Sequence, residues 1–318
     1  MNHENQATTG DSHVFTCNNL DPIRQAPQVD YAPSISGSAL LAELSIGVWE
    51  GRKKDKEASR TITTINKANK KSARVTKDLL GNCDELKAIK SCAASIRDFH
   101  RNCTLPWSNL GHRLLTNEQF LDYNREMEDR IVNFWQLVDD FLGVYSLAVS
   151  VAEVQLGTLY KAWEYPSVDA LRSKFRIHVN YMPVPERGDF RLDIPAEAKK
   201  VLEQSYNKFY DEQLTSALTD VWQRVLEPLQ HMSKMLDYNE GEKSTGFRDT
   251  LVEHVKSVAG VLKACNINKD PKMERVRIDL VNALSGVTPD GLRQNPHLRA
   301  QTKRNVDEII KGLPSLGW

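Results

Sequence analysis

Two long stretches with helical periodicity, joined by a short stretch of period two, constrain the fold of this chain most strongly. In residues 117–163 the apolar side chains fall on two neighbouring heptad phases. One phase holds Phe120, Met127, Phe134, Phe141 and Ala148, and the other holds Ile131, Val138, Tyr145, Ala152 and Leu159. In residues 196–238 apolar side chains recur at steps of three and four. Each stretch is therefore expected to form a helix with one wide apolar face.

Between the two helical stretches, apolar and polar residues alternate. The alternation covers residues 175–181 and 190–194, and residues 183–188 between them hold two prolines and a glycine. Period two on both sides of such a loop predicts a β-hairpin over residues 175–194. The sequence therefore predicts a mainly α fold. Its centre is a long antiparallel helical stalk, coiled-coil-like, capped by the hairpin, with additional helices at the base.

Four segments follow from this pattern. Residues 1–37 are polar and contain several prolines, so we expect a flexible N-terminal tail. Residues 38–116 hold a basic segment and a helix over about 84–102, packed at the stalk base. Residues 117–238 form the stalk with its hairpin tip, and residues 239–318 form a C-terminal helical region. Thr116 is the expected N-cap of the first stalk helix.

Charge balance, apolar runs and cysteine content restrict the partners and the location that we expect for this protein. The 42 Lys and Arg residues balance the 42 Asp and Glu residues, so net charge does not argue for nucleic acid or an anionic membrane. No apolar run approaches the roughly 18 residues of a membrane helix, and the first residues do not read as a secretory signal. The five cysteines are odd in number and lack a pairing pattern, which predicts free thiols and a cytoplasmic location.

Sequence motifs for catalysis are absent. There is no phosphate-binding glycine loop and no GxSxG elbow. Four potential metal ligands lie in one segment: Cys92, His100, Cys103 and His112. They lack the spacing of a zinc site. We interpret them as a buried thiol and ordinary histidines. Asp139 and Asp140 point in different directions on a helix. We therefore expect a non-enzymatic protein with no catalytic residue, metal or cofactor.

A basic segment is the main charged feature. Residues 51–77 hold ten Lys and Arg residues against Asp55 and Glu57. The spacing of Lys67, Lys70, Lys71 and Arg74 predicts one basic face of a helix, which can contact phosphates. Two interpretations stay open. The basic residues form a face that is solvated or that pairs with an acidic helix of the same chain, or they form a nucleic-acid site. The nucleic-acid site would use Lys53, Lys54, Lys67, Lys70, Lys71 and Arg74. The segment lacks interleaved aromatic residues, which argues against a base-stacking platform.

Tryptophans and the hairpin tip supply candidate protein contacts. Core packing is the default interpretation for each of five tryptophans: Trp49, Trp107, Trp135, Trp163 and Trp222. Among them Trp49, beside a basic run, and Trp107, in a proline-bounded loop, are the first candidates for exposed anchors. The predicted partner-binding residues are Trp49, Arg52, Lys53, Lys54, Trp107, Arg187, Asp189 and Arg191.

Five short motifs occur in a fixed order. They are WEGRKKDK at 49–56, TLPW at 104–107, RLL at 113–115, YP at 165–166 and GDFR at 188–191. Over residues 39–238 the chain resembles a bacteriophage and mobile-element family that carries a domain of unknown function. Members are often encoded near a MoxR-type AAA+ ATPase. The resemblance implies an accessory subunit that works with such an ATPase.

Together these observations predict a non-enzymatic role in the assembly of proteins. The expected protein is an oligomeric adaptor, accessory to an ATPase or remodelling assembly in the cytoplasm of a bacterial host, with a protein partner and no membrane contact. One alternative is a nucleic-acid-binding accessory protein of replication or recombination. Another is an inhibitor of a host defence protein.

Overall fold

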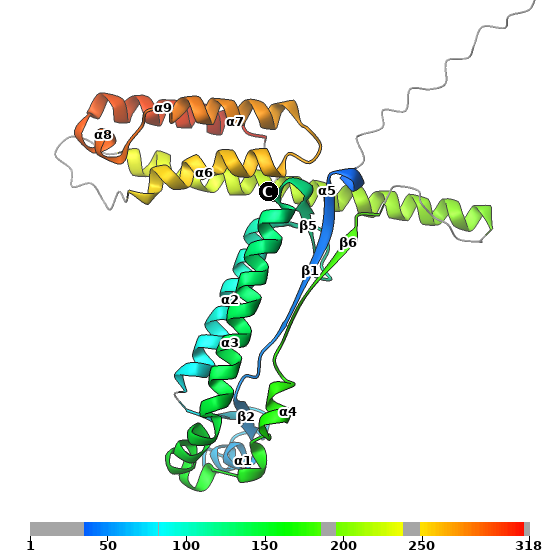
Figure 1. Cartoon of the computed structure of the whole chain (residues 1–318), viewed down its shortest axis with the longest axis vertical. Helices are drawn as coiled ribbons and strands as arrows, with labels where there is room; N and C mark the ends of the chain where they lie inside the picture. Colours follow the sequence, from blue (N-terminus) through cyan, green and yellow to red (C-terminus); the bar gives the residue numbers. More distant parts are fainter. Residues whose placement is uncertain (1–34, 82, 186–194, 238–248, 315–318) are drawn as a thin grey trace, which may run out of the picture. The chain divides into compact units, whose positions relative to one another are not determined.

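A four-stranded antiparallel sheet lies between two hydrophobic cores. In the computed structural model, which describes residues 35–81, 83–185, 195–237 and 249–314, the strand order is β4-β5-β1-β6. The strands are β1 (Ala39–Gly47), β4 (Leu105–Pro106), β5 (His112–Thr116) and β6 (Arg176–Pro183). Pairing of β1 with β6 runs from Leu40 opposite Pro183 to Gly47 opposite Arg176, and the two long strands lie side by side in Figure 1.

Alternation along the strands explains the two cores. Successive side chains of a strand point to opposite faces. In β1, Leu41 belongs to one core and Ala42 to the other, and in β5 the neighbours Leu114 and Leu115 divide in the same way. Leu41 and Leu114 thus face one core, and Ala42 and Leu115 face the other. In β6 the polar members of the period-two pattern, Arg176, His178 and Asn180, are exposed instead.

One core is formed with two neighbouring helices. Helix α2 (Asp84–Cys103) packs along α3 (Asn117–Leu156), and Figure 1 shows the two side by side. Ile89 and Ile96 of α2 belong to the same core as Phe134 and Phe141 of α3, and all four are fully buried. The predicted apolar face of residues 117–163 thus finds its partner in the helix that precedes it in the chain.

The other core is formed by α5 (Ala196–Leu236) and the C-terminal helices. Helix α5 packs against α6 (Thr250–Cys265) and α9 (Pro296–Gly312). Helix α7 (Pro271–Ala283) joins them, and α8 (Pro289–Gln294) leads into α9. Buried residues of α5 in this core include Val221, Val225, Leu229 and Met232. From residue 34 onward the chain forms one unit.

The predicted antiparallel stalk needs correction. The fold is mainly helical with a small antiparallel sheet, as expected, but the two long helices pack mainly on other partners: α3 on α2, and α5 on α6 and α9. Periodicity shows that a helix has an apolar face and does not identify the helix that covers it. The first strand of the predicted hairpin is β6, which pairs with β1. Residues 190–194, the predicted second strand, lie outside the described residues.

The remaining elements are short. Helix α3 begins after Thr116, as predicted, and ends at Leu156 because Gly157 adopts a positive φ of 49°. The chain continues through η2 (Gly157–Leu159), η3 (Ala162–Glu164) and α4 (Val168–Arg172). Near the N-terminus, η1 (Ile35–Gly37) precedes β1. Within the described ranges, none of the helices combines the length and apolarity that crossing a membrane requires.

Arg224 of α5 connects the two cores. Its guanidinium donates to the carbonyl oxygens of Arg101 (2.9 Å), Asn102 (2.6 Å) and Thr104 (2.8 Å) at the end of α2. The last carbonyls of a helix have no partner within the helix, so Arg224 supplies donors that α2 lacks. An ion pair with Asp220 at 2.7 Å orients the arginine.

We expect Arg224→Met to lower the free energy of unfolding by about 1.5–3 kcal/mol, the range for hydrogen bonds that involve a charged group. Urea denaturation followed by circular dichroism measures the change. Arg275→Met is the matched control, because Arg275 is exposed and exposed substitutions usually change stability by less than about 0.5 kcal/mol. Equal stability of the two variants would contradict a connecting role for Arg224.

Candidate anion-binding surface

The basic segment of the sequence folds into a small β-α-β unit, named here the basic module (residues 52–78). Strands β2 (Arg52–Asp55) and β3 (Val75–Asp78) pair antiparallel, and α1 (Lys56–Ile65) connects them. Helix α1 begins at Lys56 because the Asp55 carboxylate accepts hydrogen bonds from the amides of Glu57 and Ala58, both at 3.0 Å. The Ser59 hydroxyl accepts from the Val75 amide at 2.9 Å and so fastens α1 to β3.

The surface of the basic module is strongly cationic. Nine of its lysines and arginines are exposed: Arg52, Lys53, Lys54, Lys56, Arg60, Lys67, Lys70, Lys71 and Arg74. Glu57 is the exposed carboxylate of the module, whereas Asp55 is buried and Asp78 is half-buried. Among the described residues, Lys53 is the member of the nine with an ion pair, to Glu164 at 3.8 Å. The other charges are therefore available to a ligand.

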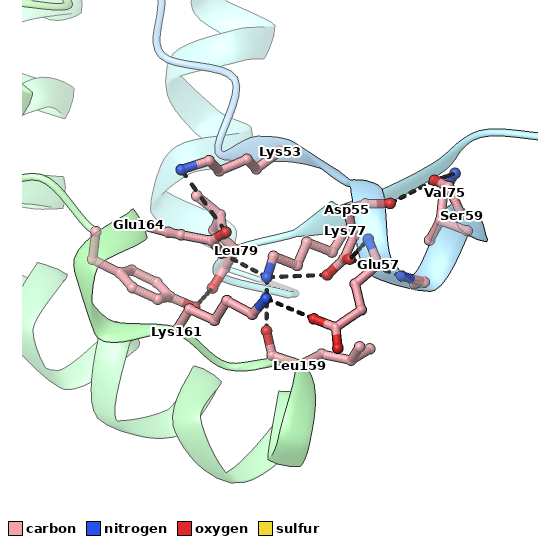
Figure 2. A network of polar contacts seen from close by, with 12 residues as sticks. Lys53, Asp55, Glu57, Ser59, Val75, Lys77, Leu79, Leu159, Lys161 and Glu164 are labelled. Carbon is pink, nitrogen blue, oxygen red and sulfur yellow. Dashed lines mark hydrogen bonds and ion pairs between the residues drawn. The ribbon is translucent and has the colours of Figure 1, made fainter. Parts of the chain in front are cut away.

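Lys77 is the exception, because its ammonium is buried against two carboxylates (Figure 2). The Lys77 Nζ atom lies 2.6 Å from Glu164 and 3.4 Å from Asp55, and donates to the Leu159 carbonyl at 2.7 Å. The Lys77 side chain is 3% exposed. Lys53 lies directly opposite Lys77 in the ladder, an arrangement that is unfavourable for like charges. Glu164 contacts both ammonium groups and offsets their repulsion.

The Asp55 carboxyl has two structural roles, as the cap of α1 and as a partner of Lys77. Its pKa is lowered from the ordinary value, first by the hydrogen bond from the Ala58 amide and then by Lys77. An ionised Asp55 satisfies both roles, because the capping interaction and the ion pair each favour the charged form. The basic module thus keeps a buried negative charge beneath its positive surface.

Two further contacts hold the basic module on residues 157–165. Lys161 donates to Glu57 at 3.1 Å (Figure 2), which raises the pKa of Lys161. The Tyr165 hydroxyl donates to the Leu79 carbonyl at 2.7 Å, and burial raises the pKa of Tyr165 to about 12. The module is therefore fixed on the segment that follows α3, about 80–100 residues away in the chain.

Trp163 is exposed beside the basic module, contrary to the core packing expected from the sequence. It is 79% exposed and lies in η3 between Lys161 and Glu164, which both bind the module. The Lys161 Nζ atom is 5.9 Å from the centroid of its ring. The sequence interpretation extended the first long helix to Trp163. Gly157, where that helix stops, was the signal that could have shown otherwise.

The predicted protein anchors are less exposed than expected. Trp107 is 4% exposed and meets the Tyr210 ring edge-on at 5.4 Å, so its role as an exposed anchor is wrong. Trp49 is half-buried and contacts the rings of Phe141 and Tyr145. Arg52, Lys53 and Lys54 are exposed on β2. The remaining predicted residues, Arg187, Asp189 and Arg191, lie outside the described residues.

The predicted basic helical face is also wrong, although its residues are exposed. Helix α1 ends at Ile65, and Lys67, Lys70, Lys71 and Arg74 lie on the connection from α1 to β3. The Asn66 side chain donates to the Ile62 carbonyl, and the Asn69 side chain accepts from the Lys71 amide. Such local hydrogen bonds compete with a continuing helix.

The cysteine and histidine residues that the structure describes were candidates for a metal or nucleophilic site. In the described ranges, no group of three or more His, Cys, Asp or Glu side chains is placed to hold a metal ion. Burial raises the pKa of the Cys92 and Cys103 thiols, which disfavours their reactive thiolate form. His100 is buried with Nδ1 at 2.7 Å from the Tyr123 hydroxyl, whereas His112 lies 3.3 Å from the Ser108 hydroxyl.

Comparison with known proteins adds no assignment. The chain matches no family model, no curated protein sequence and no solved structure. The resemblance to the mobile-element family therefore stays a prediction.

Proposed function

We propose that the protein binds an anionic partner through the basic module. The observation that carries this proposal is the set of nine exposed cations within 23 consecutive residues, with Glu57 as the exposed carboxylate among them. The whole chain has a formal net charge of zero, so the positive field is local. Local fields of this kind attract and orient an anionic partner.

The basic module presents its charges on a fixed support. The β2–β3 ladder, the Asp55 cap and the buried Lys77 ion pairs all hold its backbone in place. A pre-organised surface loses less conformational freedom on binding than a flexible basic tail. The lysine and arginine head groups stay in solvent, where salt screens them. Binding is therefore expected to weaken as ionic strength rises.

In this proposal the protein acts as an adaptor that joins the anionic partner to a second binding partner. An acidic surface of a co-encoded ATPase and a nucleic acid both carry the required charge. The non-enzymatic role, the homo-oligomer and the location in a host cytoplasm stay predictions from the sequence and the family resemblance.

Heparin chromatography with a salt gradient tests the proposal. The variant K54E/R60E/K70E reverses one charge on β2, one on α1 and one on the connection between α1 and β3. The control K200E/K272E/R275E makes the same change in net charge at exposed sites on α5 and α7. We expect the wild-type protein and the control to be retained alike, and the module variant to elute at markedly lower salt. Co-elution of the two variants, or no retention of the wild-type protein, would refute the proposal.

A further inference from the structure

We infer that the anionic partner is a single-stranded nucleic acid, with phosphates on the basic module and a base stacked on Trp163. This inference rests on the proposed function and names its ligand. Four features combine to suggest it: exposed cations on a fixed support, an exposed indole, a cation beside that indole, and contacts that hold the indole's segment against the cationic surface.

The position of Trp163 is fixed by its two neighbours in the chain. Lys161 binds Glu57 of α1 at 3.1 Å, and Glu164 binds Lys53 of β2 at 3.8 Å and Lys77 of β3 at 2.6 Å. All three elements of the basic module thus contact the short segment that carries the indole. Trp163 therefore lies at the edge of the cationic surface, although about 90 residues separate it from that surface in the chain.

Exposure of Trp163 leaves its ring available to a ligand. At 79% exposed, the indole contributes little to either hydrophobic core. A tryptophan that is not needed for packing, beside a concentration of cations, matches the two components of single-strand sites: a positive groove for the backbone and an aromatic platform for bases. Lys161, 5.9 Å from the ring centroid, places a positive charge where the phosphate of a stacked nucleotide can reach it.

The stacking platform distinguishes between kinds of anion. Single strands offer unpaired bases with free faces, whereas the bases of a duplex are already stacked on one another. An acidic protein surface offers carboxylates but no regular series of flat rings. Exposed Thr64, Asn66 and Asn69, on and after α1, add hydrogen-bonding groups among the lysines. The observations therefore favour a single strand over a duplex or an acidic protein.

Fluorescence anisotropy with three labelled probes tests the inference on the full chain. The probes are oligo(dT), an abasic deoxyribose-phosphate strand of the same length, and a blunt DNA duplex. The wild-type protein is expected to bind oligo(dT) more tightly than either other probe. Trp163→Ala should weaken oligo(dT) binding about 5- to 150-fold, the range for loss of one base–aromatic stack, and leave abasic binding unchanged. Phe209→Ala, at an exposed aromatic residue of α5, should change neither.

The outcomes separate this inference from the proposed function. Suppose that the protein is retained on heparin. Equal binding of oligo(dT) and the abasic strand then refutes the single-strand inference but not the proposed function. An unchanged affinity of Trp163→Ala for oligo(dT) has the same meaning. Tighter binding of the duplex than of oligo(dT) also refutes the single-strand inference. Displacement of oligo(dT) by poly-glutamate at equal charge refutes it too, and would indicate an acidic protein partner. Absence of both heparin retention and oligonucleotide binding refutes both. Unchanged circular dichroism of Trp163→Ala confirms that the variant is folded.

Discussion

Replacement of Lys77 by methionine is expected to lower the free energy of unfolding by about 3–5 kcal/mol, the cost of removing one partner from a buried ion pair. Lys77 lies between Glu164 (2.6 Å) and Asp55 (3.4 Å), with all three side chains less than 10% exposed. Methionine keeps most of the side-chain volume, so the loss comes from two carboxylates that lose their buried counter-charge. Urea denaturation, monitored by circular dichroism, measures the change.

Lys54→Met is the matched control for this prediction. Lys54 lies on the same two-stranded ladder, one residue along β2 from Lys53, which is opposite Lys77, and its side chain is exposed. Its replacement should change stability by less than about 0.5 kcal/mol. A double-mutant cycle with Glu164→Gln then isolates the coupling of Lys77 and Glu164. Similar stabilities for Lys77→Met and Lys54→Met would show that the buried ion pair does not stabilise the protein.

The same variant connects stability with the proposed function. The exposed cations are held in place by a ladder whose inner face is fastened to residues 159–164 through Lys77 and Lys53. We expect the loss of Lys77 to loosen the basic module before the α2–α3 core, because that core depends on apolar burial elsewhere. Local unfolding of one cooperative unit ahead of the rest is common in proteins. Hydrogen exchange of β2 and β3 amides measures this loosening.

Local signals in the sequence predicted local structure well. Thr116 marks the start of α3, the apolar spacing of residues 84–102 predicted α2, and the expected C-terminal helical region contains α6, α7 and α9. These elements depend on caps and on amphipathic spacing, which act over one to a few turns. Each of these signals lies within the element that it predicts.

The errors concern contacts between distant parts of the chain. Nothing in the spacing of residues 117–163 and 196–238 distinguishes pairing with each other from pairing with α2 and α6. Lys77 resembles the other lysines of its segment in sequence, but in the fold it is buried against Leu159 and Glu164, more than 80 residues later in the chain. Trp163 shows the reverse case. It continues an apolar pattern in the sequence and is exposed in the fold because α3 ends at Leu156.

Acidification from pH 6.5 to pH 4 should lower the free energy of unfolding by about 2–3 kcal/mol through His100 alone. Burial, with a smaller contribution from Arg113, lowers the pKa of His100 from 6.5 to about 4. The histidine side chain is neutral in the folded protein across this window, whereas in the unfolded chain it takes up a proton. Unfolding therefore binds a proton, and stability falls with falling pH. Well above pH 6.5 neither state holds the proton, so there this contribution is constant.

His100→Gln separates this effect from the titration of the carboxylates. Glutamine is neutral at every pH and retains a group that can bond to the Tyr123 hydroxyl, the partner of His100 Nδ1 at 2.7 Å. The difference in unfolding free energy between the wild-type protein and His100→Gln should change by about 2–3 kcal/mol between pH 7 and pH 4. His231→Gln, at an exposed histidine, should show no such change. A constant difference for His100→Gln would mean that the folded protein accepts a proton on His100 at little cost, and therefore that the helix end beside Arg113 opens to solvent in acid.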